Sequence, residues 1–587
     1  MSSQPALAQQ RRTGPGRGVL VGLFALSLGI LTFDSELGSP DETTRWNLAL
    51  ELARHGPAAL WDSAKLSRYP PLQSVLAAPL AAMGLRIDGG APGVWTQRLG
   101  VSVSLLAAAL TCLVFFGFAR RLLGDERRAA LAAVLFGLTS PLLPYSKRFF
   151  SEPLTALLVL AAFAGAHARV SGAGRRVWLG ALACVVLLPQ NNLVVVPAVG
   201  LGLGVWLLAE RRFDLLKQLV GAEVLAAALL LATTLVRFGG TLSSGYSSER
   251  FTFATLDGLH GLLFGWGRSV FLFAPMLLLG ALGWNRVRAR ARGLAWGGLA
   301  AFGATLLLVA SWWCWWGGIC WGPRLMLPVL PLASIFAVGA LERWRVPDRA
   351  LTAAVLAGGL YVQFLGVAFK HDFDIYFWMK PDYSDERRAW FEWDRSVLKR
   401  MPLHFEQHPW DVSSVFLHRE RSGPSRVELA GGPVRRVRVE HRGDALFSWW
   451  SISDVYALSA EGRRAAGTLG ATARASIGRA PEAALDGQPH TRWTTERKRL
   501  DGMWFELELP EARTDLQALE LEHAPNDGDF PNGLTARVDD GSGAWREVPA
   551  TAATPRLRWS PLIWLFAGLT LASGAAALRP GRAAREA

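Results

Sequence analysis

The sequence is poor in charged residues for a chain of its length. Asp, Glu, Lys and Arg make up only 19% of its 587 residues, whereas 51% are hydrophobic. A soluble chain of this size normally forms several domains with a more highly charged surface, so an ordinary soluble protein is excluded. The hydrophobic residues are instead gathered into uncharged stretches of roughly 17–21 residues, each long enough to cross a bilayer as a helix.

The chain also lacks a concentrated basic patch and a signal-peptide cleavage site. Its net charge is +14, but the basic residues lie in short connections between apolar stretches. Orientation in a membrane explains that distribution, and nucleic-acid binding does not. No small-residue cleavage site follows the apolar run 19–33, which is therefore expected to be an uncleaved first span.

Cysteine is scarce, with four residues in the whole chain. Cys112 and Cys184 fall inside apolar segments, where we expect them to be inert core residues. Cys314 and Cys320 flank one Trp-rich loop. They form either a disulfide, if that loop faces an oxidising compartment, or two separate thiols.

What is present is a series of about twelve apolar segments. Arginine-rich connections follow every second segment, on the same side as the N-terminal arginines and the C-terminal tail. The pattern predicts a polytopic α-helical membrane protein with a cytoplasmic N-terminus and its large loops on the opposite face. Heavy use of Ala, Gly and Arg suggests a bacterial inner membrane. The expected spans are 17–33, 98–118, 129–145, 153–169, 177–190, 193–209, 219–236, 269–284, 294–312, 324–341, 350–367 and 560–578.

The outer face is predicted to carry the longer loops. These are 34–97, 145–153, 237–268 and 312–324, together with a large polar region at 368–558. Loops of such length on one face are where function usually resides.

The first outer loop contains a predicted helix. A proline followed by Asp41 and Glu42 is typical of a helix start, where the dipole favours acidic side chains. Trp46, Leu48 and Leu52 recur at helical spacing, which indicates an amphipathic helix on the membrane surface. One interpretation is that the two acids only cap this helix, and the other is that they carry chemistry.

Charged residues of the other outer loops favour the second interpretation. Arginine and lysine bind phosphate groups, and a carboxylate can take a proton from an attacking hydroxyl. Carboxylates and cations that meet at a membrane surface therefore suit a phosphorylated lipid substrate. The residues concerned are Lys65, Arg68, Lys147, Arg148, Glu152 and Arg324.

These motifs, taken in order, resemble the GT-C glycosyltransferases, in particular the branch with the protein O-mannosyltransferases and the aminoarabinose transferase of lipid A. The likeness covers roughly residues 15–370. In two places the sequence departs from the family: Tyr69 stands where a cation often precedes the proline segment, and Thr44 lengthens the spacing to Arg45 by one residue. The motifs are Pro40-Asp41-Glu42-Thr43 with Arg45 and Trp46, Tyr69-Pro70-Pro71-Leu72, the segment 145–153, and Trp315-Trp316-Gly317-Gly318 through Arg324 to Pro328.

The resemblance implies that a sugar is transferred from a polyprenyl-phosphate carrier with inversion at the anomeric carbon. Asp41 is then the expected base, with Glu42 beside it and Glu152 as the acid of the second outer loop. Some members use a divalent metal, for which these three acids offer oxygen ligands, but nothing in the sequence requires a metal or another cofactor. The expected donor-phosphate ligands are Arg68, Lys65, Lys147, Arg148 and Arg324.

The region 368–558 is predicted to be mainly β, because alternating runs such as 434–440 and 504–509 are separated by turn residues. Residues 471–550 resemble the discoidin (factor 5/8 type C) β-sandwich, which often binds carbohydrate. Trp493 and Trp504 either pack the core of that fold or stack on a sugar. The domain is then a glycan-binding accessory or a lid. The motifs are Ala484-Leu485-Asp486-Gly487, Thr491-Arg492-Trp493-Thr494, Gly502 with Trp504 to Leu509, Pro531, Gly533, Asp540-Gly541 and Trp545.

The predicted organisation is thus a tail at 1–16, a transmembrane catalytic domain at 17–367, the β-rich region, and a last helix with its tail at 559–587. We expect transfer to a hydroxyl of an envelope glycan, lipid or protein on the outer face of the bilayer. The main alternative is a transporter or flippase of a lipid-linked molecule, and a second is a membrane protein that only displays the β domain. Transporter sites tend to lie in mid-membrane, whereas these charges lie in outer loops.

Overall fold

The structure is a computed structural model, and it describes most of the chain between residues 16 and 579. The predicted cytoplasmic tail at 1–16 lies almost wholly outside the described residues. The residues within 16–579 that are not described are 36, 243–244, 246–248, 253, 319, 343–345, 369–385, 408–413, 422, 430, 444–448, 489–490, 497–498, 524–530, 532 and 554.

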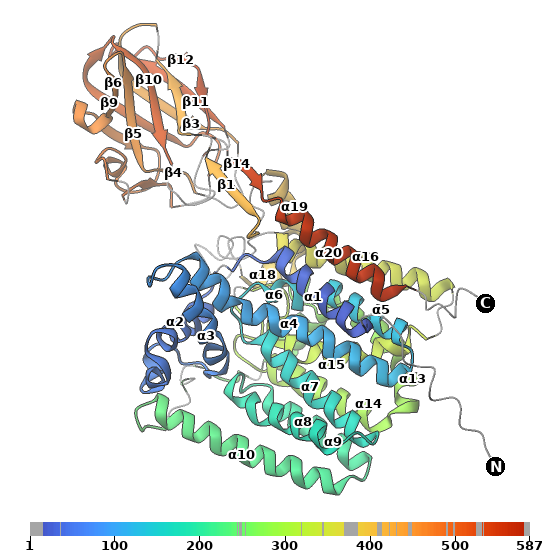
Figure 1. The fold of residues 1–587 in the computed structure, drawn as a ribbon. Helices are drawn as coiled ribbons and strands as arrows, with labels where there is room; N and C mark the ends of the chain where they lie inside the picture. The colour runs from blue at the N-terminus through green and yellow to red at the C-terminus, as the bar shows by residue number, and fades with distance from the viewer. Residues whose placement is uncertain are drawn as a thin grey trace, which may run out of the picture.

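The protein has a body of packed helices and a C-terminal β domain (Figure 1). Several helices are apolar enough to make it a membrane protein. In the described part of the chain, five are long and apolar enough to cross a bilayer: α4 (Val94–Leu123), α7 (Glu152–Val170), α10 (Phe213–Arg237), α14 (Arg292–Ala310) and Arg349–Ala368 within α16 (Val346–Ala368). Shorter apolar helices are α1 (Arg17–Thr32), α3 (Leu72–Ile87), α9 (Val196–Ala209), Arg324–Gly339 and α20 (Leu562–Leu578).

Three predicted spans are interrupted in the structure. The segment 129–145 forms α5 (Glu126–Thr139) and α6 (Leu142–Ser146), and 269–284 forms α12 (Val270–Phe273) and α13 (Met276–Arg290). The segment 324–341 consists of short turns, η4 (Arg324–Val329), α15 (Leu330–Ser334) and η5 (Ile335–Gly339). A proline lies in or beside each break, at Pro141, Pro275, Pro328 and Pro331, where it removes a backbone donor.

The first outer loop is more ordered than its sequence indicated. The predicted amphipathic helix is α2 (Pro40–His55), and it buries Trp46, Leu48 and Leu52 as its spacing indicated. A second helix, α3, follows it and packs against α2 and α4. The sequence motif Tyr69-Pro70-Pro71-Leu72 ends at the first residue of α3, and the sequence did not predict the helix that follows. Because α3 packs against both α2 and α4, it holds α2 beside the body of packed helices.

The ends of several helices meet at one side of the body. Arg17 Nη2, at the start of α1, donates to the carbonyl of Arg579 at 3.0 Å. Arg127, at the start of α5, donates to the carbonyl of Leu578 at 2.9 Å. The opposite ends of these helices therefore lie toward the β domain. Figure 1 shows that domain beyond the start of α20.

The β domain is a sandwich of two five-stranded antiparallel sheets. One has the order β13-β2-β10-β5-β6 and the other β12-β11-β3-β9-β7, and buried side chains of both form one core. The strands are β2 (Ser425–Glu428), β3 (Val434–His441), β5 (Asp454–Ser459), β6 (Gly462–Ala465), β7 (Thr472–Ala475), β9 (Trp504–Arg513), β10 (Leu516–Glu522), β11 (Leu534–Asp539), β12 (Arg546–Val548) and β13 (Ala550–Thr551). The segment before residue 471, which carried no motif, thus contributes strands to both sheets.

A short ribbon joins the sandwich to the helices. Strands β1 (Leu417–Arg421) and β14 (Pro555–Trp559) pair with each other, and α20 follows directly. The Val415 N–H donates to the carbonyl of Phe33 at 2.7 Å, which fixes the ribbon to the end of α1. Preceding helices α18 (Glu386–Phe391) and α19 (Val397–Gln407) show that the outer region is not all β.

Helices α9 and α14 approach each other closely through glycines. A Cβ atom added at Gly297 lies 2.5 Å from the Gly202 carbonyl oxygen and 2.7 Å from the Trp206 Cβ. Small residues allow such backbone approach between apolar helices, where dispersion contacts replace the hydrophobic effect as the driving force. In contrast, Gly303 on the same helix has open space around it.

This contact predicts a large difference between two alanine substitutions on α14. Gly297→Ala should lower stability by about 1–3 kcal/mol, because the added methyl forces the helices apart. Gly303→Ala should be neutral or slightly stabilising, since it only improves helix propensity. Thermal unfolding of the purified protein in detergent measures both, and equal melting temperatures would contradict the close packing.

Candidate active site

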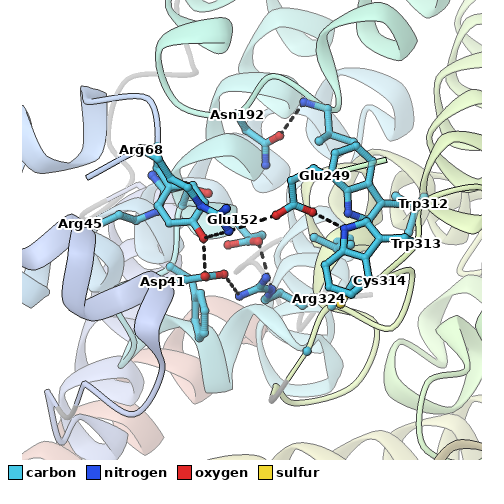
Figure 2. A pocket seen from close by; sticks show the side chains of 18 residues that line it. Asp41, Arg45, Arg68, Glu152, Asn192, Glu249, Trp312, Trp313, Cys314 and Arg324 are labelled. Atoms are coloured by element: carbon cyan, nitrogen blue, oxygen red, sulfur yellow. Dashed lines mark hydrogen bonds and ion pairs between the residues drawn. The ribbon is translucent and has the colours of Figure 1, made fainter. Parts of the chain in front are cut away.

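Asp41 lies at the edge of a polar cavity and is held there by two side chains. Tyr69 donates its hydroxyl proton to Asp41 Oδ1, and Arg324 Nη1 lies 3.0 Å from Asp41 Oδ2. The Asp41 side chain keeps 31% of its surface exposed, so an incoming group can reach it. Figure 2 shows the Asp41 carboxylate beside Arg324.

Glu42, the neighbour of Asp41, has a different environment. It is completely buried and receives the backbone N–H groups of Gly38, Ser39 and Phe149. Arg148 also donates to both of its oxygens, at 2.9 and 2.7 Å. Together with the Ser39 hydroxyl it forms the capping box that starts α2. The capping interpretation therefore applies to Glu42, whereas Asp41 faces the cavity.

The cavity has a volume of about 240 Å³ and is lined by parts of the chain that are far apart in sequence. Asp41 begins α2, Glu152 begins α7 and Arg324 begins η4, so each lies at the end of an element. Three carboxylates and three guanidinium groups line it, which leaves its formal charge balanced. The charged lining residues are Asp41, Glu152, Glu249, Arg45, Arg68 and Arg324.

Arg324 connects two of the three acids that the sequence proposed for chemistry, Asp41 and Glu152. Its Nη1 contacts Asp41, its Nε lies 3.5 Å from Glu152 Oε1, and its guanidinium stacks 4.6 Å from the Phe150 ring centre. Glu152 is 4% exposed, and its Oε2 has no hydrogen-bond partner among the described residues. A buried unpaired carboxylate oxygen at a cavity wall is a position for a ligand donor.

Two guanidinium groups flank the Tyr69 ring on the opposite wall. The Arg45 Cζ lies 4.4 Å from the ring centre and the Arg68 Cζ lies 5.2 Å from it. Arg45 is 6% exposed and makes no ion pair within 4 Å with a described residue, whereas Arg68 pairs with Glu249 at 3.0 Å. The sequence motifs contain Arg45 and Tyr69 but predict no role for them, and Glu249 belongs to none of these motifs.

The three other predicted phosphate ligands lie outside this cavity lining. Lys147 is buried and donates to Asp34 and to the carbonyl of Val367, both at 2.7 Å. Arg148 is engaged by Glu42, as described above. Lys65 pairs with Asp62 and leaves 79% of its side chain exposed. Of the predicted cations, Arg68 and Arg324 line the cavity.

The Trp-rich loop between α14 and η4 forms one side of the cavity. Arg268 is buried and donates to the carbonyls of Cys320 and Gly318 at 2.8 and 3.0 Å, which fixes the loop. The Tyr145 hydroxyl also donates to the carbonyl of Trp321, at 2.8 Å. Cys314 and Cys320 are separate thiols in the structure.

The ionisation of Asp41 follows from its partners. Burial raises the pKa of Asp41, but the Arg324 charge, the Tyr69 hydrogen bond and the Arg45 charge together outweigh burial and hold it below its usual value. Burial, followed by the negative charge of Asp41, raises the pKa of Tyr69 to about 12. At neutral pH Asp41 is therefore a carboxylate and Tyr69 remains a hydroxyl donor.

The acids of the site are not arranged as a metal cage. Glu42 is turned away into its own network, and Arg324 lies between Asp41 and Glu152. Within the described residues, no three His, Cys, Asp or Glu side chains form a group that could hold a metal ion.

The two tryptophans proposed for carbohydrate binding lie in different places. Trp493 is completely buried in the sandwich core, against Trp450 and Phe505. Trp504 lies partly exposed on β9, with the Arg438 guanidinium 4.4 Å from its ring centre. Core packing therefore accounts for Trp493, and Trp504 presents an arginine-covered ring on the sheet.

Comparison with known proteins finds distant structural similarity and no match in sequence. No protein-family model and no curated protein matches the chain. The structure is similar to ArnT from Cupriavidus metallidurans in the apo state, at 17% identity and a TM-score of 0.42, over 65% of this chain and 73% of that chain. The same protein bound to undecaprenyl phosphate gives 17% identity and 0.41, over the same shares of the two chains.

A second similarity is to the archaeal oligosaccharyltransferase AglB from Archaeoglobus fulgidus in complex with an inhibitory peptide and a dolichol-phosphate. The identity is 11% and the TM-score 0.37, over 60% of this chain and 55% of that chain. At such TM-scores, these similarities assign neither a family nor an activity to the chain.

The contrast between Glu42 and Asp41 gives a stability prediction. Glu42→Gln should cost about 3–5 kcal/mol, because it removes the charge of a fully buried carboxylate that accepts from Arg148 and from three backbone N–H groups. Asp41→Asn should cost much less, since Arg324 keeps Glu152 as a partner. Thermal unfolding in detergent distinguishes them, with Glu51→Gln on the same helix as a neutral control. A Glu42→Gln protein as stable as the control would contradict the structural assignment.

Proposed function

We propose that the protein transfers a sugar from a polyprenyl-phosphate carrier to a hydroxyl group of a cell-envelope acceptor, with inversion at the anomeric carbon. The observation that carries this proposal is Asp41, an accessible carboxylate, placed in one cavity with three guanidinium groups. The order of motifs that resembles the GT-C glycosyltransferases supports the same reaction. The cavity is proposed to open on the outer face of a bacterial inner membrane.

Asp41 is the proposed base. Its low pKa keeps it ionised, and its exposed edge allows an acceptor hydroxyl to approach. Because the leaving group is a phosphate, the reaction needs no strong acid, and the base only has to bind and deprotonate the hydroxyl as the new bond forms. Tyr69 and Arg324 then position the carboxylate, one on each oxygen.

Arg45 and Arg68 are the proposed ligands of the donor phosphate. They lie on one wall, near the Tyr69 ring, and among the described residues Arg45 has no carboxylate partner within 4 Å. Guanidinium groups placed where negative charge develops stabilise the departing phosphate. Arg324 is proposed to neutralise Asp41 and Glu152 rather than the phosphate, because it already contacts both acids.

Glu152 is the proposed ligand of a sugar or acceptor hydroxyl. Its free Oε2 is a buried acceptor in the cavity wall, and a hydroxyl proton would satisfy it. The β domain is proposed as an accessory that faces the same side of the membrane. A transporter remains the alternative, although Asp41, Glu152 and Arg324 lie at the starts of helices or turns rather than in the middle of a helix.

The base assignment predicts a folded but inactive variant. Asp41→Asn should reduce transfer by at least about a hundredfold, because the amide cannot accept the hydroxyl proton. Mass spectrometry of envelope glycans and glycoproteins, from a gene-deletion strain complemented with each variant, measures the product. Glu51→Gln on the same helix is the matched control and should restore it.

Two outcomes would contradict this assignment. Full transfer by the Asp41→Asn protein would remove Asp41 as the base. Loss of lipid translocation in that variant, with transfer of sugar intact, would favour the transporter instead.

The partners of Asp41 predict a shift in the pH dependence of activity. Tyr69→Phe removes a hydrogen bond that lowers the pKa of Asp41, so that pKa should rise. A base must be ionised, and the acid limb of the transfer rate should therefore move to higher pH in this variant. Initial rates between about pH 2.5 and 7 would show the shift, because the wild-type limb lies below the usual carboxyl pKa of 3.8. An acid limb at the wild-type position would mean that Asp41 is not the titrating group.

A further inference from the structure

Glu249 has no role in the proposed chemistry, yet its carboxylate lies in the cavity. One oxygen accepts from Arg68 Nη2 at 3.0 Å, and the other accepts from the Trp313 indole N–H. The side chain is only 11% exposed, so the carboxylate is largely desolvated. Figure 2 shows it between the Arg68 wall and the Trp-rich loop, across the cavity.

Hydrogen bonds fix the backbone that follows Glu249, whereas the Glu249 side chain can rotate. Trp313 N–H donates to the Arg250 carbonyl at 3.0 Å, and the Thr252 N–H donates to the Ser311 carbonyl at 3.0 Å. These bonds attach the segment after Glu249 to the Trp-rich loop. Glu249 itself belongs to no helix or strand. Departure of its carboxylate from Arg68 therefore requires only rotation about side-chain bonds, which have low barriers.

Glu249 differs in this respect from the other two acids of the cavity. Asp41 and Glu152 share Arg324 and begin helices, so their positions are fixed. Glu249 instead neutralises Arg68, a guanidinium on the wall proposed for the phosphate. A carboxylate and a phosphodiester each carry one negative charge and accept the same guanidinium hydrogen bonds.

We infer that Glu249 is an internal anion that occupies the phosphate subsite at Arg68 and is displaced when the lipid-linked donor binds. Its carboxylate keeps the buried charges balanced in the empty cavity, and the donor phosphate must compete with it for Arg68. Glu249 therefore lowers and tunes donor affinity. This inference rests on the proposed function, because it takes the donor to be a polyprenyl phosphate.

Binding of undecaprenyl phosphate to the full chain in detergent micelles tests the inference. Glu249→Gln keeps the size of the side chain and removes the competing charge, so it should bind this lipid about tenfold more tightly than the wild type. Undecaprenol, which lacks the phosphate, should show no gain. The gain should also vanish in an Arg68→Gln background, because both effects act through one guanidinium.

The outcomes separate this inference from the proposed function. Wild-type binding together with equal or weaker binding by Glu249→Gln would overturn the role of Glu249 and leave the donor assignment intact. A gain that persists in the Arg68→Gln background would also overturn it. Failure of every variant to bind the lipid would overturn the donor class and this inference with it. Glu249→Ala gives the same comparison if the glutamine variant does not fold.

Discussion

The position of the proposed base depends on a buried ion pair next to it. Glu42 accepts from Arg148 and from three backbone N–H groups, and it thereby joins the start of α2 to the second outer loop. A buried carboxylate with so many donors has one stable orientation, because any other would break its hydrogen bonds to these donors. Since Asp41 precedes Glu42 on the same helical turn, this orientation also fixes Asp41 at the cavity edge. Asp41 itself can stay exposed because its neighbour holds the helix.

Around this fixed point, a continuous chain of polar contacts crosses the cavity. Trp313 donates to Glu249, Arg68 donates to Glu249 and to Tyr69, and Tyr69 donates to Asp41. Arg324 then continues from Asp41 to Glu152. Donors and acceptors alternate along the chain, and with Arg45 the cavity lining holds three carboxylates and three guanidinium groups. An anion that binds Arg68 competes with the Glu249 carboxylate, which lies outside any helix. The variants proposed at Glu249 and Tyr69 alter this chain at two different links.

The sequence predicted much of the helical body and less of the cavity. Apolar length and arginine placement located a helical segment at each predicted span, but prolines such as Pro275 divided some of them, and α3 was missed within a loop. Asp41, Glu152, Arg68 and Arg324 were selected as charges in outer loops, and all four line the cavity. The same criterion selected Lys147 and Arg148, although both are buried and are paired with Asp34 and Glu42. Glu249 lies in the predicted outer loop 237–268 but belongs to none of the motifs, and only the fold brings it to Arg68, 181 residues away in sequence.

Tyr69 lies beside the proposed base, and its contacts show what a neutral donor provides at this position. A phenol with a pKa of about 12 stays protonated, so it donates to Asp41 without adding a charge. Its ring also has a negative face, which attracts guanidinium groups. The Arg45 and Arg68 Cζ atoms lie 4.4 and 5.2 Å from the ring centre. A lysine at this position would repel both arginines and would pair with Asp41, lowering its value as a base. The tyrosine instead organises two cations beside the base while leaving one edge of the carboxylate open.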